Sequence, residues 1–198
     1  MASHLGILAV LQALRERLSI RMAARLGGNP QVEILGSQSL TGTPQPNTDT
    51  LGLYLHRVSV DPFSRNRHLP PAEGRRAPRP ELPVNLHVML IAWCTHTEQE
   101  ISYLATAIQI LGSALSLGSA DVSLADPAWG HEDSVQVLPE EMSTEDLMRI
   151  WDSLPGDYRL SAPYLIKTVR LAPDVDPLDG PPVRTLVFPM DERGEAAQ

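Results

Sequence analysis

Val84-Asn-Leu-His-Val-Met-Leu-Ile-Ala-Trp93 is a nearly continuous apolar run rich in β-forming residues. A strand that is apolar throughout, rather than at every second residue, is typical of a sheet covered on both faces. We therefore expect residues 84–93 to form the central strand of a sheet around which the rest of the chain is arranged.

Other segments have the pattern of neighbouring strands. Residues 51–60 alternate, so that Leu51, Leu53 and Leu55 share one face while Tyr54, His56 and Val58 share the other. Residues 158–171 predict a second long strand, and residues 32–35 and 134–138 predict two short ones.

Three segments predict helices. Residues 3–26 repeat apolar side chains at the spacing of one helix face, with Ser3 as a candidate N-cap and Gly27-Gly28 as the stop. Thr97 and Glu100 have the spacing of a capping box that opens a long helix through Leu117. Because that helix is apolar on two faces, we expect the sheet to cover one face and the N-terminal helix or a neighbouring subunit to cover the other.

A third, short helix is predicted to begin after Ser143, with Asp146 in its first turn, and to end at Pro155-Gly156. The expected fold class is α/β (α+β), with a mixed sheet packed by these three helices in a single domain over residues 1–172. Residues 61–83 contain six prolines and no periodicity, and predict an extended Pro/Arg-rich loop. Residues 173–198 predict a Pro-rich, acidic C-terminal arm.

Composition narrows the function classes. Apolar residues make up 42% of the 198 and charged residues 20%, which argues against a wholly disordered chain. The single cysteine, Cys94, excludes an internal disulfide and C-x-x-C metal sites. A net charge of −8, with Lys167 as the only lysine, argues against general nucleic-acid binding. The start of the chain has no basic segment before its apolar residues, so we expect neither a signal peptide nor a membrane span.

Signatures of catalysis are weak. The chain has no G-x-S-x-G elbow, H-E-x-x-H pair, P-loop or G-x-G-x-x-G. Cys94, His96 and Glu98 are spaced two apart at a strand-to-helix junction, and His56 and His87 fall on neighbouring predicted strands. One alternative is therefore a small metal- or Cys/His-dependent enzyme built on the Cys94/His96 region. The start of a helix at this point accounts for His96 and Glu98 without a catalytic or metal-binding role, because polar and acidic side chains are favoured there.

Charge is distributed unevenly along the chain. Residues 121–157 contain ten acidic residues against Arg149 alone, whereas the N-terminal helix and the 65–79 loop together contain nine arginines against Glu16 and Glu73. Such polarity suits head-to-tail contacts in a closed ring, and it equally suits a monomer whose own patches compensate.

The order and spacing of these segments resemble a known family. Its pieces here are an opening helix, a glutamate-containing helix and five sequence stretches, namely Leu53-Tyr-Leu-His-Arg-Val58, Ser64-Arg-Asn-Arg-His-Leu-Pro70, the strand Pro83–Trp93, Leu147-Met-Arg-Ile-Trp-Asp-Ser-Leu154 and Lys167-Thr-Val-Arg-Leu171. Over residues 1–172 the chain resembles the cap, or tail-terminator, proteins of phage-tail-like contractile injection systems, long known as an uncharacterised domain family.

The resemblance implies a structural protein with no enzyme activity and no cofactor. It implies a ring, a hexamer in the family, that closes the distal end of the inner tube and anchors the last sheath ring. The implied partners are other copies of the chain, the inner tube protein and the sheath protein, with no nucleic acid and no membrane. Assembly is expected in the cytoplasm, in a particle that stays inside the cell or is released on lysis.

The resemblance assigns no individual interface residues, so these are predicted from their chemistry. The loop arginines suit bidentate contacts with carboxylates, and the tail stretch around residue 187 suits strand addition to a sheath subunit or an adjacent cap. The predicted interface residues are Arg65, Arg67, Arg75, Arg76, Arg79, Leu186, Val187 and Phe188. Alternatives for these segments are a frayed terminus and nucleic-acid binding by the arginines.

Overall fold

The computed structural model describes residues 2–40, 49–64, 81–112, 115–154 and 158–172. Within them, six strands form one mixed sheet in the order β1-β2-β3-β6-β5-β4. Only β1 and β2 pair in parallel, and the other neighbours are antiparallel. The strands are β1 Gln31–Leu35, β2 Thr50–Val60, β3 Leu82–Trp93, β4 Leu115–Leu117, β5 Val135–Pro139 and β6 Ser161–Leu171. The predicted fold class is confirmed.

The strand β3 lies between the two other long strands and is buried from Pro83 to Trp93. Alternate residues from Val84 to Ala92 belong to one apolar core, whereas Met89, Ile91 and Trp93 belong to a second core on the opposite face. The apolar run therefore forms a strand covered on both faces, as its sequence predicted.

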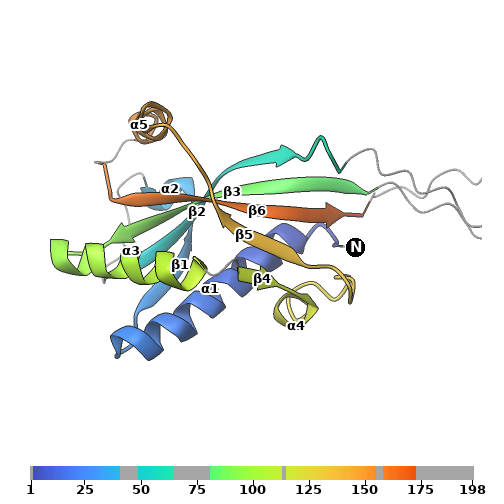
Figure 1. Cartoon of the computed structure of the whole chain (residues 1–198), viewed down its shortest axis with the longest axis horizontal. Coiled ribbons are helices and arrows are strands. Elements are labelled where there is room, and N and C mark those ends of the chain that lie inside the picture. The colour runs from blue at the N-terminus through green and yellow to red at the C-terminus, as the bar shows by residue number, and fades with distance from the viewer. Residues whose placement is uncertain (1, 41–48, 65–80, 113–114, 155–157, 173–198) are drawn as a thin grey trace, which may run out of the picture.

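Helices cover the two faces unequally (Figure 1). The long helices α1 Gly6–Leu26 and α3 Thr97–Leu111 lie on one side, together with the single turn α4 Ser119–Val122. The other side holds α5 Thr144–Asp152 and the turn α2 Ser37–Leu40, which contribute Trp151 and Leu40 to the second core. None of the described helices is long and apolar enough to cross a membrane.

The predicted end of the second helix is wrong. The helix α3 stops at Leu111, and residues 115–117 form the edge strand β4, in which Leu115 and Leu117 point into the core and Ser116 is exposed. Pairing with β5, in which Leu117 lies opposite Val135, gives these backbone groups partners in the sheet that a helix would have supplied locally. Two further helical turns, α2 and α4, lie outside the three segments predicted to be helices.

Helix starts were predicted with mixed success. The Ser143 hydroxyl accepts a hydrogen bond from the Asp146 N–H and caps α5, as expected. In contrast, Leu5 and His96 occupy the N-cap positions of α1 and α3 without a side-chain cap. The Glu100 carboxylate does not complete the predicted capping box, and instead accepts a hydrogen bond from the Leu160 N–H at 3.2 Å.

The second apolar face of α3 remains partly uncovered in the subunit. Leu104, Ala107, Ile110 and Leu111 are buried toward the sheet and α1, whereas 55% of Ile101 and 41% of Ile108 are exposed. The sequence left open whether the N-terminal helix or a neighbouring subunit covers the second face of α3. Within the subunit, α1 packs against α3.

Candidate functional site

A hydrogen-bonded series of polar side chains lies on the sheet face that carries the second core. The His87 ring, buried in β3, is 2.7 Å from Glu140 through Nδ1 and 2.8 Å from the Ser59 hydroxyl through Nε2. The His56 ring packs edge-on against His87 with ring centres 6.1 Å apart. The series therefore ties β2, β3 and the segment after β5 together.

Burial favours the neutral form of His56. Desolvation lowers the pKa of His56 below its usual 6.5, and the charge of Glu140 opposes that shift. His56 Nε2 and Glu140 Oε2 are buried without a hydrogen-bond partner. His56 and His87 do lie side by side, as their predicted strands suggested, but the described residues contain no group of three or more His, Cys, Asp or Glu arranged to hold a metal ion.

The order Ser59–His87–Glu140 matches the order of groups in serine hydrolases. Such enzymes also place the serine at an exposed turn beside donors for an oxyanion. Here Ser59 lies inside β2, and it lines neither of the cavities described below. We interpret the series as a structural network that joins three segments. The sequence analysis missed Glu140 because 53 residues separate it from His87.

The Cys94 thiol has the wrong protonation state for nucleophilic chemistry. Cys94 is buried, and burial, with the charges of Asp49 and Glu100, raises the pKa of its thiol to about 11. At neutral pH the sulfur is therefore a thiol, whereas the thiolate is the nucleophile and metal ligand. His96 is exposed at the start of α3.

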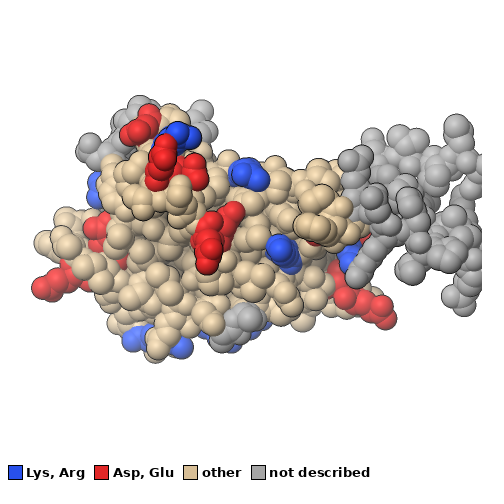
Figure 2. Space-filling view, turned by 45° about the horizontal axis from the view of Figure 1, so that its top comes forward, with Lys and Arg blue, Asp and Glu red and all other residues tan. Residues whose placement is uncertain are grey.

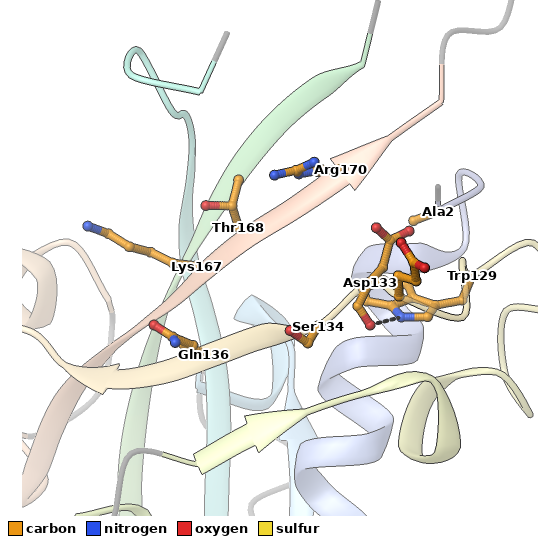
Figure 3. A pocket seen from close by; sticks show the side chains of 9 residues that line it. Ala2, Trp129, Asp133, Ser134, Gln136, Lys167, Thr168 and Arg170 are labelled. Carbon is orange, nitrogen blue, oxygen red and sulfur yellow. Dashed lines mark hydrogen bonds between the residues drawn. The ribbon is translucent and has the colours of Figure 1, made fainter. Parts of the chain in front are cut away.

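A cavity of about 530 Å³ opens where β5 and β6 diverge (Figure 3). The two strands pair from Gln136–Lys167 to Pro139–Tyr164. Beyond Lys167, the edge of β6 that faces β5 has one β-bridge among the described residues, between Leu171 and Ala2. Lys167 and Arg170 lie on its β6 side, whereas Glu132 and Asp133 lie on the loop before β5. Opposite charges thus line one open, polar space. A second cavity, of about 500 Å³, lies between α1 and β1.

Acidic side chains gather over α5 (Figure 2). Glu141, Glu145, Asp146 and Asp152 are exposed there, and Arg149 pairs with Glu145 at 2.6 Å. On the opposite face of the sheet, α1 exposes Arg15, Arg21 and Arg25, while Arg17 pairs with Asp121. The exposed side of α5 is therefore mainly acidic, whereas that of α1 is mainly basic.

Exposed apolar side chains cluster at one end of the sheet. The exposed fractions are 46% for Val58, 44% for Val60, 44% for Leu82 and 92% for Phe63. Asp61 fixes this end, because its carboxylate accepts hydrogen bonds from the Phe63 N–H and from the hydroxyls of Ser64 and Thr168. Asp61 thus holds the turn that carries Phe63 against β6, next to the strand residues of the patch.

The predicted interface residues Arg65, Arg67, Arg75, Arg76, Arg79, Leu186, Val187 and Phe188 lie outside the described residues. The points where their segments join the fold are described. Asp61 N–H donates to the Pro83 carbonyl, and Leu82 lies opposite Leu171 in the sheet. The loop and the arm therefore leave from the same end of β2, β3 and β6 (Figure 1).

Comparison with known proteins gave one family and related structures. The family model described as the Pvc16 N-terminal domain matches residues 9–185. No curated protein sequence matched at a significant level.

Two solved structures share the fold. One is the sheath/tube terminator of an extracellular contractile injection system, PVC, in its extended state, with 17% identity, a TM-score of 0.56, and coverage of 97% of this chain and 65% of that chain. The other is the tube-terminating cap of the anti-feeding prophage, with 16% identity, a TM-score of 0.56, and coverage of 91% and 60%. The chain thus spans less than two thirds of the length of either structure.

Proposed function

The chain belongs to the Pvc16 N-terminal domain family, and on this premise we propose that it is the tube-terminating cap of a contractile injection particle. It closes the distal end of the inner tube and anchors the last ring of sheath. The observation that carries this function is the family match over residues 9–185, together with a shared fold with two terminators of such particles.

As a cap, the protein acts by binding rather than by catalysis. The partners we propose are other copies of the chain, in a ring of six, together with the tube protein and the sheath protein. The opposite charges on α1 and α5 support side-by-side contact between subunits in a closed ring, since such a contact joins unlike surfaces. We propose assembly in the cytoplasm and action as part of a particle that is kept in the cell or released.

The loop and the arm are the parts we propose to reach the tube, the sheath or a neighbour. The described strands from which both start, β2, β3 and β6, end or begin at the same end of the sheet. Deleting residues 174–198 should leave a folded subunit that fails to retain sheath. Normal sheath retention by the truncated protein would remove the arm from this role.

Electron microscopy of particles made with and without the chain tests the function directly. We expect missing, overlong or sheathless tubes without it, and tubes of normal length when it is added back. Normal particles of normal length in its absence would overturn the proposal. Cys94→Ser should restore particles as well as the wild type does, because the buried thiol has no part in a binding role.

A further inference from the structure

The edge strand β1 covers only the first half of β2. The strand β1 pairs with β2 only from Thr50 to Tyr54. From Leu55 to Val60, no strand among the described residues pairs with this outer edge. Open edges present unpaired N–H and C=O groups, which act as a template for another strand.

The open edge has an apolar face. Val58 lies opposite Leu86 and Val60 lies opposite Val84, which places both valines on the face of the main core. Whereas Leu86 and Val84 are buried, nearly half of each valine is exposed. A strand added beside β2 would cover both side chains and continue the core outward.

The arm of the chain contains a segment that matches this edge. Val183-Arg-Thr-Leu-Val-Phe188 has six residues, as many as the open stretch 55–60, and is rich in β-forming side chains. In an extended strand Leu186 and Phe188 share one face, so they can lie beside Val58 and Val60. Because β6 ends beside Leu82, the arm starts at the end of the sheet where the open edge lies.

The length of the linker between β6 and this segment, residues 173–182, bears on whether the segment pairs with its own subunit or with a neighbour. Residues 173–182 include Pro173, Pro177, Pro181 and Pro182. Proline-rich segments favour extended conformations of about 3.1 Å per residue, so ten residues span ~30 Å. The edge of the same subunit is two strands from β6, a distance of ~10 Å. A span of this length exceeds the distance to that edge and is long enough to reach another subunit.

We propose that residues 183–188 of one subunit pair with the outer edge of β2, residues 55–60, in a second copy of this chain. The proposal rests on the proposed function in one respect, that copies of the chain stand side by side in a ring. Each subunit gives one strand and receives one, so a closed ring leaves no such edge unpaired.

Disulfide cross-linking of the purified full-length chain tests the proposal without tube or sheath. Val58→Cys in one chain is mixed with Leu186→Cys or Phe188→Cys in another, and the products are separated on a non-reducing gel. We expect a covalent heterodimer that disappears on reduction. The matched control is Leu124→Cys mixed with the same tail variants, because Leu124 is also exposed but lies between α4 and β5, and it should give only background.

A second set of variants measures association without new thiols. Val58→Lys or Val60→Lys places a charge on the open edge, and each should lower self-association at least tenfold in sedimentation. The matched control Leu124→Lys should leave self-association unchanged. Melting temperatures near the wild-type value would show that all three variants are folded.

Two outcomes would overturn the proposed pairing between residues 183–188 of one subunit and residues 55–60 of another. One is the absence of the heterodimer, and the other is a Val58→Cys/Leu186→Cys double variant that cross-links only within a single chain. Neither outcome bears on the microscopy of particles, which tests the cap function separately.

Discussion

The Asp126 carboxylate accepts a hydrogen bond of 2.8 Å from the backbone N–H of Ser3, 123 residues earlier in the chain. It also accepts one of 3.1 Å from the Ala128 N–H, and Asp126 itself is only 1% exposed. The contact fixes the entry to α1 against the loop before β5. At Gly6, the first residue of α1, a Cβ atom would collide with Ala2 and approach Asp126, so this joint admits little side-chain volume.

Removing the Asp126 carboxylate should therefore destabilise the fold. Asp126→Ala removes the acceptor of two part-buried hydrogen bonds, from the Ser3 and Ala128 N–H groups, and we expect a loss of ~1–2 kcal/mol in the free energy of unfolding. Asp126→Asn keeps an acceptor oxygen and should lose less. Urea denaturation measures both, and an alanine variant as stable as the wild type would show that the joint contributes nothing.

Trp151 should be the main anchor of α5. It is buried with Met89, Ile91 and Trp93, and its indole N–H donates to the Ser161 hydroxyl at 3.2 Å. We expect Trp151→Ala to cost ~3–5 kcal/mol, and Trp151→Phe to cost less because it keeps most of the packing. The control Phe63→Ala, at a 92% exposed site, should change stability by less than ~0.5 kcal/mol. Equal losses at the two sites would contradict the assignment.

Stability should fall as the pH is lowered through the range in which histidines titrate. Burial holds the pKa of His56 below 6.5 in the folded protein. As the pH drops from 7 to 5, the unfolded chain binds a proton at this residue before the folded chain does, so protonation favours unfolding. His56→Gln should flatten the pH dependence of the unfolding free energy by up to about one bound proton. An unchanged slope would show that His56 titrates equally in both states.

Cys94 should resist thiol reagents while the protein is folded. Its pKa of about 11 leaves little thiolate at pH 8, and burial blocks access. Iodoacetamide should modify it at least ~10-fold more slowly in buffer than in denaturing urea, where the thiol is exposed with an ordinary pKa. Mass spectrometry follows the modification. Rapid, stoichiometric labelling of the folded chain would revive the alternative of a reactive cysteine.

The loop arginines should contribute to assembly rather than to folding. Arg75→Glu combined with Arg76→Glu should weaken association with the ring or tube by several kcal/mol if these side chains are desolvated in the particle. Sedimentation of assembled particles measures the loss. Equal assembly by the loop variant and the wild type would show that these arginines remain solvated.

Local sequence patterns predicted the helices and strands whose formation depends least on which other segments pack against them. The run from Val84 to Trp93 is apolar on both faces, and any sheet that covers both faces satisfies it. The start of α5 was predicted because the Ser143 cap is made within four residues. Only part of the polar network could be predicted. His56 and His87 fall on neighbouring predicted strands, whereas Glu140 lies in a segment distant in the sequence.

The sequence by itself determined the central strand, the three helices, the fold class and the family resemblance, because each depends on the order and periodicity of nearby residues. Tertiary structure alone decided that residues 115–117 join the sheet, that Glu100 binds the Leu160 N–H, and that the loop and arm leave from one end. It also left the outer edge of β2 open beyond Tyr54. In each of these cases the free energy comes from backbone or side-chain groups far apart in the chain, and no local pattern records which of them will meet.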